Sequence, residues 1–365
     1  MKPFLLQLLH TPRSSEALTL YTFRTAAGPE ADVLDGILVA SQSRKAYPVI
    51  DGIPVMQDDA FPATFLEKYA KEIAAEKGLA GVALPVAKGS RWSFSDEWAE
   101  HFEANLDKTW GWSVDQRVQQ FLLETGVDAE WCRGKVILDA GCGNGQLTEA
   151  LSRLGAHVVG LDFSTSVFTA EKRRQSQNVY FLRGDLRTPP FAPETFDIIV
   201  SNGVLHHTPS TYEAFSQVAK IARTGGRFYL WLYRKPHTGL RRFLLYPAIE
   251  TTRFIVARMP HLIQPFVIRA FTAVVMAFHK LLGRHSGISW QERIVDMYDL
   301  LTPLWRHYHT PTEVSYWFFE NGYGAASLTH WDNPFGFGMV ATKGPQAQTP
   351  GINFEREQVK RRFWT

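Results

Sequence analysis

Three alternating glycines that directly follow a short apolar run are the residues of this chain best suited to bind a ligand. The run is 136–140, and Gly141, Gly143 and Gly145 follow it in the stretch VILDAGCGNG. Glycine tolerates left-handed backbone conformations and lets a ligand approach the main chain closely. The helix expected from Gln146 would add N–H donors and positive potential. The pattern predicts a site for a polar or anionic group, but Gln146 means that the dinucleotide pattern G-x-G-x-x-G is not met.

Acidic residues follow each of the next two apolar runs. Asp162 comes after residues 158–161, and Asp185 comes shortly after residues 179–182. Ligands of open α/β sheets bind at the carboxyl ends of the strands, so these acids are expected beside the glycines. Asp162 is placed to accept hydrogen bonds from ribose hydroxyls, and Asp185 is placed for an adenine amino group.

The elements needed to position these residues are visible in the hydrophobic pattern. Strand-length apolar runs continue at 198–201 and 227–232, and stretches with helical spacing lie between the runs, at 146–153, 166–175 and 211–222. Continuous Val/Ile/Leu runs indicate strands buried on both faces, hence a parallel sheet with helices on either side. A helix at 312–321 and two strand-like pieces at 326–331 and 336–342 follow later.

The stretches LDAGCGNG, GLDFS, RGDL and FDIIVSNGVLHH together resemble the successive cofactor motifs of class I S-adenosylmethionine-dependent methyltransferases, over roughly residues 110–342. The resemblance implies an α/β fold with a Rossmann-like seven-stranded sheet, whose reversed hairpin matches the two late strands. It implies S-adenosylmethionine as the cofactor. The cofactor-binding residues predicted in this way are Asp139, Gly141, Gly143, Gly145, Asp162, Phe163, Asp185, Leu186 and Asn202. Arg117, before the first strand, is a candidate for the cofactor carboxylate, with a surface salt bridge as the alternative.

Two adjacent histidines follow the fourth strand of this sheet. Asn202 is followed by Gly203 rather than by Pro-Pro-aromatic, which disfavours the methyltransferases that act on nucleic acids or glutamine. The pair His206-His207 resembles the Leu-His-His of small-molecule methyltransferases. A hydroxyl acceptor needs a base to take its proton, and histidine suits this role near neutral pH. His207, and less strongly His206, are the predicted catalytic residues; the alternative is that both are structural.

A second cluster of histidines and aromatic residues lies before the helix at 312–321. The predicted substrate pocket consists of Tyr233, His307, Tyr308 and His309, with Asp299 as a further candidate. Thr310 or Thr312 is expected to cap the helix. No carboxylate stands at metal-ligand spacing from these histidines, and two cysteines cannot form a zinc site alone, so no metal is predicted.

The chain divides into six predicted segments. They are a small β-rich module (1–60), a helical linker that covers the cofactor (61–134), the cofactor-binding α/β core (135–233), a basic amphipathic insert or lid (234–288), the C-terminal part of the methyltransferase domain (289–345) and a polar tail (346–365). The first module resembles the zinc-ribbon-type domain that accompanies or activates methyltransferases. Thr11, Ser14, Ala40 and Ser43 stand where that family has cysteines, so no zinc is expected. The module is predicted to be structural or to dock a partner.

The net charge of +3 conceals an uneven distribution. It is the balance of 39 Lys+Arg and 36 Asp+Glu, whereas residues 234–284 contain nine Lys/Arg and only Glu250 as an acid, giving 9 − 1 = +8 and leaving 3 − 8 = −5 elsewhere. A basic amphipathic segment is typical of a lid or of contact with an anionic membrane surface. Nucleic acid is disfavoured as a partner. The N-terminal stretch MKPFLLQLLHTP lacks a cleavage site, and no apolar stretch reaches 18 residues. We therefore predict a cytoplasmic protein, with peripheral contact with a membrane as the open alternative.

The predicted reaction is O-methylation of a small-molecule or lipid-linked hydroxyl acceptor, such as a sugar or an isoprenoid-like metabolite. Two alternatives remain open. The chain is an N- or C-methyltransferase of a natural product, in which the histidines orient the acceptor, or it is a non-catalytic partner that binds S-adenosylmethionine.

Overall fold

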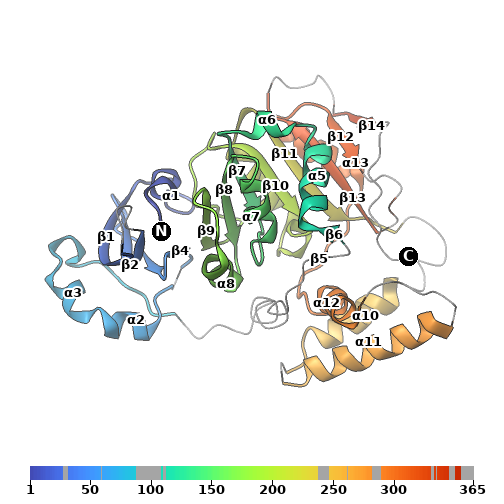
Figure 1. The fold of residues 1–365 in the computed structure, drawn as a ribbon, viewed down its shortest axis with the longest axis horizontal. Helices are drawn as coiled ribbons and strands as arrows, with labels where there is room; N and C mark the ends of the chain where they lie inside the picture. The colour runs from blue at the N-terminus through green and yellow to red at the C-terminus, as the bar shows by residue number, and fades with distance from the viewer. Residues whose placement is uncertain are drawn as a thin grey trace.

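One long mixed sheet organises the protein (Figure 1). The computed structural model describes residues 1–27, 32–58, 60–87, 108–109, 112–236, 246–260, 262–281, 289–329, 333, 335–344 and 350–354. Within these residues the strand order of the sheet is β1-β2-β3-β4-β9-β8-β7-β10-β11-β13-β12-β14. A short second sheet joins β5 (Lys108–Thr109) to β6 (Trp112–Ser113).

The centre of the sheet consists of five parallel strands, and it confirms the apolar runs predicted as strands. They are β7 (Val136–Ala140), β8 (His157–Asp162), β9 (Val179–Gly184), β10 (Phe196–Asn202) and β11 (Ala222–Tyr233). The chain order reverses between β7 and β10, which is the switch point where open α/β sheets bind ligands. β13 (Gly336–Thr342) runs antiparallel between β11 and β12 (Ala326–Thr329), which completes the expected Rossmann-like sheet of seven strands.

Helices cover both faces of this sheet. One face packs against α5 (Val114–Thr125), α7 (Gln146–Ser152) and α8 (Ser166–Arg173), and the other against α9 (Thr211–Lys220) and α13 (Pro311–Glu320). The short helix α6 (Ala129–Cys132) leads into β7. Of the two predicted caps, Thr310 is the one used: its hydroxyl accepts from the Glu313 N–H in a capping box.

The N-terminal module continues the sheet rather than forming a separate layer. It contains α1 (Pro3–Leu8), β1 (Leu18–Thr25), β2 (Val33–Ala40), β3 (Ala46–Ile50) and β4 (Ile53–Met56). β4 pairs in parallel with β9, with Val55 opposite Arg183, so the module and the core share one hydrogen-bonded sheet. At the opposite edge, β14 (Ile352–Phe354) pairs with β12 in what was predicted to be a polar tail.

The helix predicted after the module is interrupted. It consists of α2 (Ala63–Lys68), α3 (Ala70–Ala75) and the 3-10 turn η1 (Lys77–Leu79). The break falls at Tyr69, whose hydroxyl donates to the buried Asp35 carboxylate in the module. Within the predicted helical linker, residues 88–107, 110 and 111 lie outside the described residues.

Three helices form a bundle beyond the sheet, at the lower right of Figure 1. They are α10 (Tyr246–Val256), α11 (Gln264–Leu281) and α12 (Trp290–Leu301), and they share a core that includes Val256, Ile268 and Met297. The bundle therefore extends past residue 288, the predicted end of the insert, because α12 packs on the two helices before it. No helix in the described part of the chain has the length and hydropathy needed to cross a bilayer.

Candidate active site

The glycine loop between β7 and α7 has the backbone conformation that its sequence predicts. Gly141, Gly143 and Gly145 have φ values of +92°, +54° and +76°, all in the left-handed region. Asp162 fixes the loop to the end of β8, because one carboxylate oxygen accepts from the Gly143 N–H at 2.8 Å and the other from the Ser164 N–H at 2.8 Å. A Cβ added at Gly143 would meet no atom within 4 Å, so the main chain there borders open space.

Asp139 lies beneath this loop and is almost completely buried. It accepts a hydrogen bond from the Thr148 hydroxyl at 2.7 Å. Burial raises the pKa of Asp139 to about 6, although Thr148 and the positive charge of Arg117 oppose the shift. Arg117, on α5, is therefore close enough to act electrostatically on the predicted cofactor site.

The residues predicted for the nucleoside end of the cofactor lie at the ends of β8 and β9. Phe163 follows Asp162 with about half of its surface exposed, and Leu186 is buried. Asp185 receives hydrogen bonds from the Arg187 guanidinium, the shortest at 2.6 Å, and from the Arg187 main chain at 2.8 Å. An adenine amino group would therefore share the Asp185 carboxylate with Arg187. Asn202 ends β10, half-buried, beside Gly203.

The histidine pair closely follows Val204, which packs against the glycine loop. Val204 fills the space that a side chain at Gly141 would need, since a Cβ there would lie 2.3 Å from a Val204 methyl carbon. Two residues later, His206 is completely buried, with its ring 4.1 Å from the centre of the Tyr233 ring. Neither ring nitrogen of His206 has a hydrogen-bond partner among the described residues. Burial holds the pKa of His206 well below its usual value, so this imidazole is neutral at physiological pH.

His207 has a defined tautomer. Its Nδ1 lies 3.1 Å from the Trp305 carbonyl oxygen, which can only accept, so Nδ1 carries the proton and Nε2 carries the lone pair. Nε2 lies 3.8 Å from a carboxylate oxygen of Asp299. Burial lowers the pKa of His207, and the negative charge of Asp299 partly opposes this effect. His207 is therefore a neutral imidazole whose Nε2 faces the Asp299 carboxylate.

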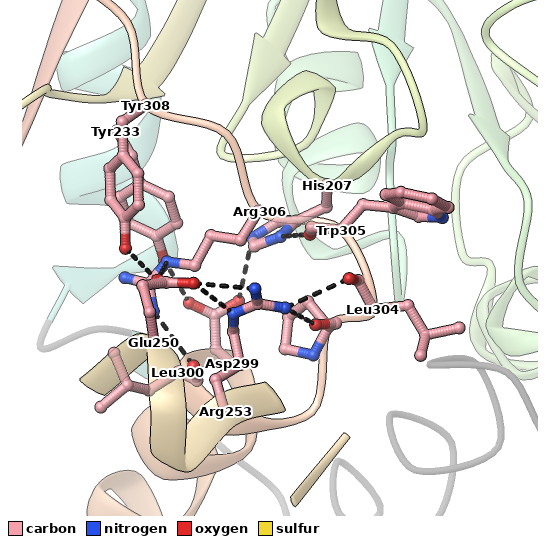
Figure 2. A network of polar contacts seen from close by, with 11 residues as sticks. His207, Tyr233, Glu250, Arg253, Asp299, Leu300, Leu304, Trp305, Arg306 and Tyr308 are labelled. Atoms are coloured by element: carbon pink, nitrogen blue, oxygen red, sulfur yellow. Dashed lines mark hydrogen bonds and ion pairs between the residues drawn. The ribbon is translucent and has the colours of Figure 1, made fainter. Parts of the chain in front are cut away.

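Asp299 connects the histidine to Tyr233 and to the helical bundle (Figure 2). Its second carboxylate oxygen accepts from the Tyr233 hydroxyl at 2.8 Å. Burial, followed by the charge of Asp299, raises the pKa of Tyr233 well above its usual value, so the phenol stays protonated. The guanidinium of Arg306 lies 4.3 Å from the centre of the Tyr233 ring and donates to the Leu300 carbonyl oxygen.

Glu250, the only acid of the basic segment, joins the same network from α10. Arg253 binds its carboxylate at 2.7 Å, and the Tyr308 hydroxyl donates to it at 2.5 Å. Arg253 also donates to the Pro303 and Leu304 carbonyl oxygens. The bundle is thus attached to β11 and to residues 303–308 mainly by hydrogen bonds of Asp299, Glu250 and Arg253, as Figure 2 shows.

The structure brings some predicted pocket residues together and directs others elsewhere. Tyr233 and Tyr308 lie in the network of His207, with their ring centres 6.0 Å apart. His307 binds the Thr208 carbonyl oxygen through Nε2, and its main-chain N–H donates to the His206 carbonyl oxygen. His309 lies between Thr211 and Glu313, at 3.0 and 3.1 Å, so it connects α9 to α13 and its nitrogens are already engaged.

Sequence reasoning missed Arg306, Arg253 and Glu250. A single acid within a strongly basic segment is the signal that could have identified Glu250, since a lone acid among cations is a natural ion-pair partner. Within the described residues, no group of three or more His, Cys, Asp or Glu side chains is arranged to hold a metal ion.

Comparisons with known proteins agree with this geometry. Residues 138–230 match a family described as "Methyltransferase domain". The chain is 33% identical over 100 residues to the ubiquinone biosynthesis O-methyltransferase of Coxiella burnetii, a match covering 27% of this chain and 43% of that protein. It is 33% identical over 107 residues to a sterol 24-C-methyltransferase of Gibberella zeae, covering 27% and 28% respectively. The chain therefore spans less than half the length of either relative.

Among solved structures, the magnesium protoporphyrin IX methyltransferase of Synechocystis PCC 6803 with bound SAH is 17% identical, covers 78% of this chain and 96% of that one, and has a TM-score of 0.38. Residues 138–230 match a methyltransferase domain, and they supply the central parallel strands of the Rossmann-like sheet. S-adenosylmethionine is its cofactor, and the residues present suit it: the loop glycines border open space and Asp162 stands at the end of β8.

Proposed function

We propose that the whole chain is an S-adenosylmethionine-dependent methyltransferase that methylates a hydroxyl group of a small-molecule or lipid-linked acceptor, such as a sugar or an isoprenoid-like metabolite. The observation that carries the proposal is the 3.8 Å separation of His207 Nε2 and the Asp299 carboxylate, three residues after Val204, which packs against Gly141 of the glycine loop. A base is needed for a hydroxyl nucleophile but not for a neutral amine, whose lone pair is already available.

The cofactor, when bound, supplies an electrophilic methyl group on a sulfonium. The chain holds the acceptor in line and removes its proton. His207 Nε2 takes the hydroxyl proton while Trp305 holds Nδ1–H, and the resulting imidazolium is stabilised by Asp299. Tyr233 keeps Asp299 in place through its hydroxyl, which makes Tyr233 a positioning residue.

Arg117 is proposed to bind the carboxylate of the cofactor. Its charge already reaches the buried Asp139, which lies next to the glycine loop. Asp162 is proposed to bind the ribose with the oxygen lone pairs that the Gly143 and Ser164 N–H groups leave available, because each carboxylate oxygen can accept more than one hydrogen bond.

The N-terminal module is proposed to be a metal-free derivative of a zinc-ribbon-type domain. Its support is Glu16, whose carboxylate accepts from the Ser14 hydroxyl and from the Gln42 and Ser43 N–H groups. The carboxylate therefore bridges the two turns that carry the predicted cysteine positions. Elemental analysis of the purified protein tests this proposal; stoichiometric zinc would overturn it.

Three measurements test the reaction. Calorimetry with S-adenosylhomocysteine should give heat that disappears in Asp162→Ala; no heat from the native chain would remove cofactor binding altogether. Cell extract incubated with methyl-labelled cofactor and the chain, then partitioned, should yield label in the small-molecule or lipid fraction rather than in macromolecules. His207→Gln should retain calorimetric binding and lose about 10²–10⁴-fold of the transfer rate. Full transfer by His207→Gln would favour an acceptor that needs no base, as in N- or C-methylation.

A further inference from the structure

The exposed apolar side chains of the described residues are concentrated in α10, α11 and the turn between them. Sixteen large apolar residues are exposed, and eight of them lie within residues 254–281. These eight are Phe254, Ile255, Leu262, Ile263, Phe266, Val274, Phe278 and Leu281. The rest are scattered over the remainder of the chain. A contiguous apolar surface of this kind marks an interaction site.

Helix α11 carries apolar side chains on the face turned away from the bundle as well as on the face that packs against it. The inner face buries Gln264, Ile268 and Thr272 against the bundle. The outer face exposes Phe266 by 72%, Val274 by 66% and Phe278 by 58%. At 100° per residue these side chains fall within a single sector of the helix, and small alanines fill the positions between them. From Phe266 to Leu281 the strip is about 22 Å long at 1.5 Å per residue.

Positive charge borders this strip. Arg269 and Lys280 are exposed on α11 at the edge of the apolar sector, three turns apart, and Arg258 is exposed at the end of α10 with its guanidinium over the Phe254 ring. α11 contains no acid. Glu250 is the only acid of α10, and Arg253 and Tyr308 engage it within the active-site network. On α12, Asp296 lies beside Arg293 and Asp299 faces His207.

We propose that the outer face of α11, together with the α10–α11 turn, docks onto an anionic lipid bilayer, with α11 lying parallel to the membrane plane. Apolar side chains enter the acyl boundary while the flanking Arg and Lys side chains reach the headgroups. The strip is long, and the described cations Arg269 and Lys280 lie along one of its edges, which complements a negatively charged, laterally uniform surface. An amphipathic helix with basic borders is the known geometry of interfacial helices.

The docking surface and the catalytic residues belong to one bundle. Glu250 on α10 and Asp299 on α12 both reach the His207 network, while α11 packs on α12. If the proposed O-methylation holds, on which this step rests, the acceptor is a membrane-embedded lipid whose polar hydroxyl end reaches the site beside the bundle. Docking itself does not depend on the reaction.

Vesicle flotation of the full chain tests the docking. We expect it to float with phosphatidylcholine vesicles that contain phosphatidylglycerol, to float much less with phosphatidylcholine alone, and to lose binding in high salt. Phe266→Asp combined with Val274→Asp should reduce the bound fraction about tenfold or more, and so should Arg269→Glu combined with Lys280→Glu. Matched controls away from the bundle, Val86→Asp with Tyr316→Asp and Lys71→Glu with Lys172→Glu, should float like the native chain.

Binding of S-adenosylhomocysteine by calorimetry is the independent readout, since none of the substituted residues lies at the cofactor site. Retained heat together with lost flotation supports docking. Native chain that binds S-adenosylhomocysteine but does not float on anionic vesicles overturns docking and leaves the methyltransferase proposal intact. A native dimer in light scattering that Phe266→Asp with Val274→Asp converts to monomer, without flotation of either, assigns the face to a second copy and also overturns the proposal.

Discussion

Two glycines of the same loop should respond differently to substitution by alanine. Gly143 and Gly145 both have left-handed φ values, so each pays the strain of an L side chain, about 1–2 kcal/mol. At Gly145 the new Cβ would also lie 2.6 Å from the Phe181 ring and 2.8 Å from the Ala170 Cβ, both buried. Overpacking of this kind costs about 1–3 kcal/mol more. Gly145→Ala should therefore lower the free energy of unfolding by about 2–5 kcal/mol.

At Gly143 the added Cβ would meet nothing within 4 Å. The loss of stability should then be limited to backbone strain, about 1–2 kcal/mol, partly offset by the smaller entropy of the unfolded chain. The open space is where the cofactor is expected to approach the main chain. Gly143→Ala should weaken S-adenosylhomocysteine binding by about 10–100-fold, which corresponds to about 1.4–2.8 kcal/mol.

The measurements are urea unfolding for stability and calorimetry for affinity. Gly134→Ala is the matched control, because Gly134 has φ +70° and likewise nothing within 4 Å of an added Cβ, but lies before β7. It should reproduce the stability loss of Gly143→Ala and bind S-adenosylhomocysteine with native affinity. Native affinity in Gly143→Ala would refute the placement of the cofactor over this loop, and equal stability of the two loop variants would refute the packing argument.

Three further predictions concern charge. Asp139 has a pKa of about 6 in the folded protein, above its value of 3.8 in the unfolded chain. Its ionisation therefore destabilises the fold, with no penalty near pH 4 and the full penalty above pH 6. In urea unfolding, Asp139→Asn should stabilise the cofactor-free protein by about 3 kcal/mol at pH 8 and hardly at all at pH 4. Hydrogen bonds from the Ser43 N–H, with those from Ser14 and Gln42, lower the pKa of Glu16 to about 2. The ionised Glu16 carboxylate therefore stabilises the fold fully above pH 4.5, and this stabilisation disappears as the pH falls through 2. Glu16→Gln should lower the melting temperature at pH 7 but not near pH 2. Asp299→Asn should lower the pKa of His207 further, observed as displacement of its imidazole titration in NMR spectra, and an unmoved titration would contradict the assigned geometry.

The sheet could be predicted from the sequence because buried parallel strands have a local signature. Each central strand is a continuous apolar run, and the glycine loop follows β7 without interruption. The register of β4 against β9 could not be predicted, since nothing in the apolar run around Val55 specifies a partner more than a hundred residues later. The break at Tyr69 has the same cause: a long-range hydrogen bond to Asp35 outweighs local helical periodicity.

The candidate site was likewise predictable from the sequence only in part. The residue types after β10 predicted a base, but the tautomer of His207 depends on the Trp305 carbonyl, a main-chain group with no sequence signature. Asp299 was only one candidate among several pocket residues until α12 placed it beside Nε2. His309 was predicted in the pocket as part of the cluster of histidines and aromatic residues before α13, and in the structure it is hydrogen-bonded to Thr211 on α9.

The acidic and basic residues of the insert are separated more clearly in the structure than in the sequence. Arg253 and Arg306 are balanced by Glu250 and Asp299 in a buried network, and removal of any one of the four leaves an uncompensated charge. Because Glu250 is used there, the described outer surface of α10 and α11 presents cations without acids. The network that joins the bundle to His207 therefore leaves the opposite side of the bundle basic and apolar. The proposed catalysis and the proposed membrane docking both depend on the inward orientation of the Glu250 carboxylate.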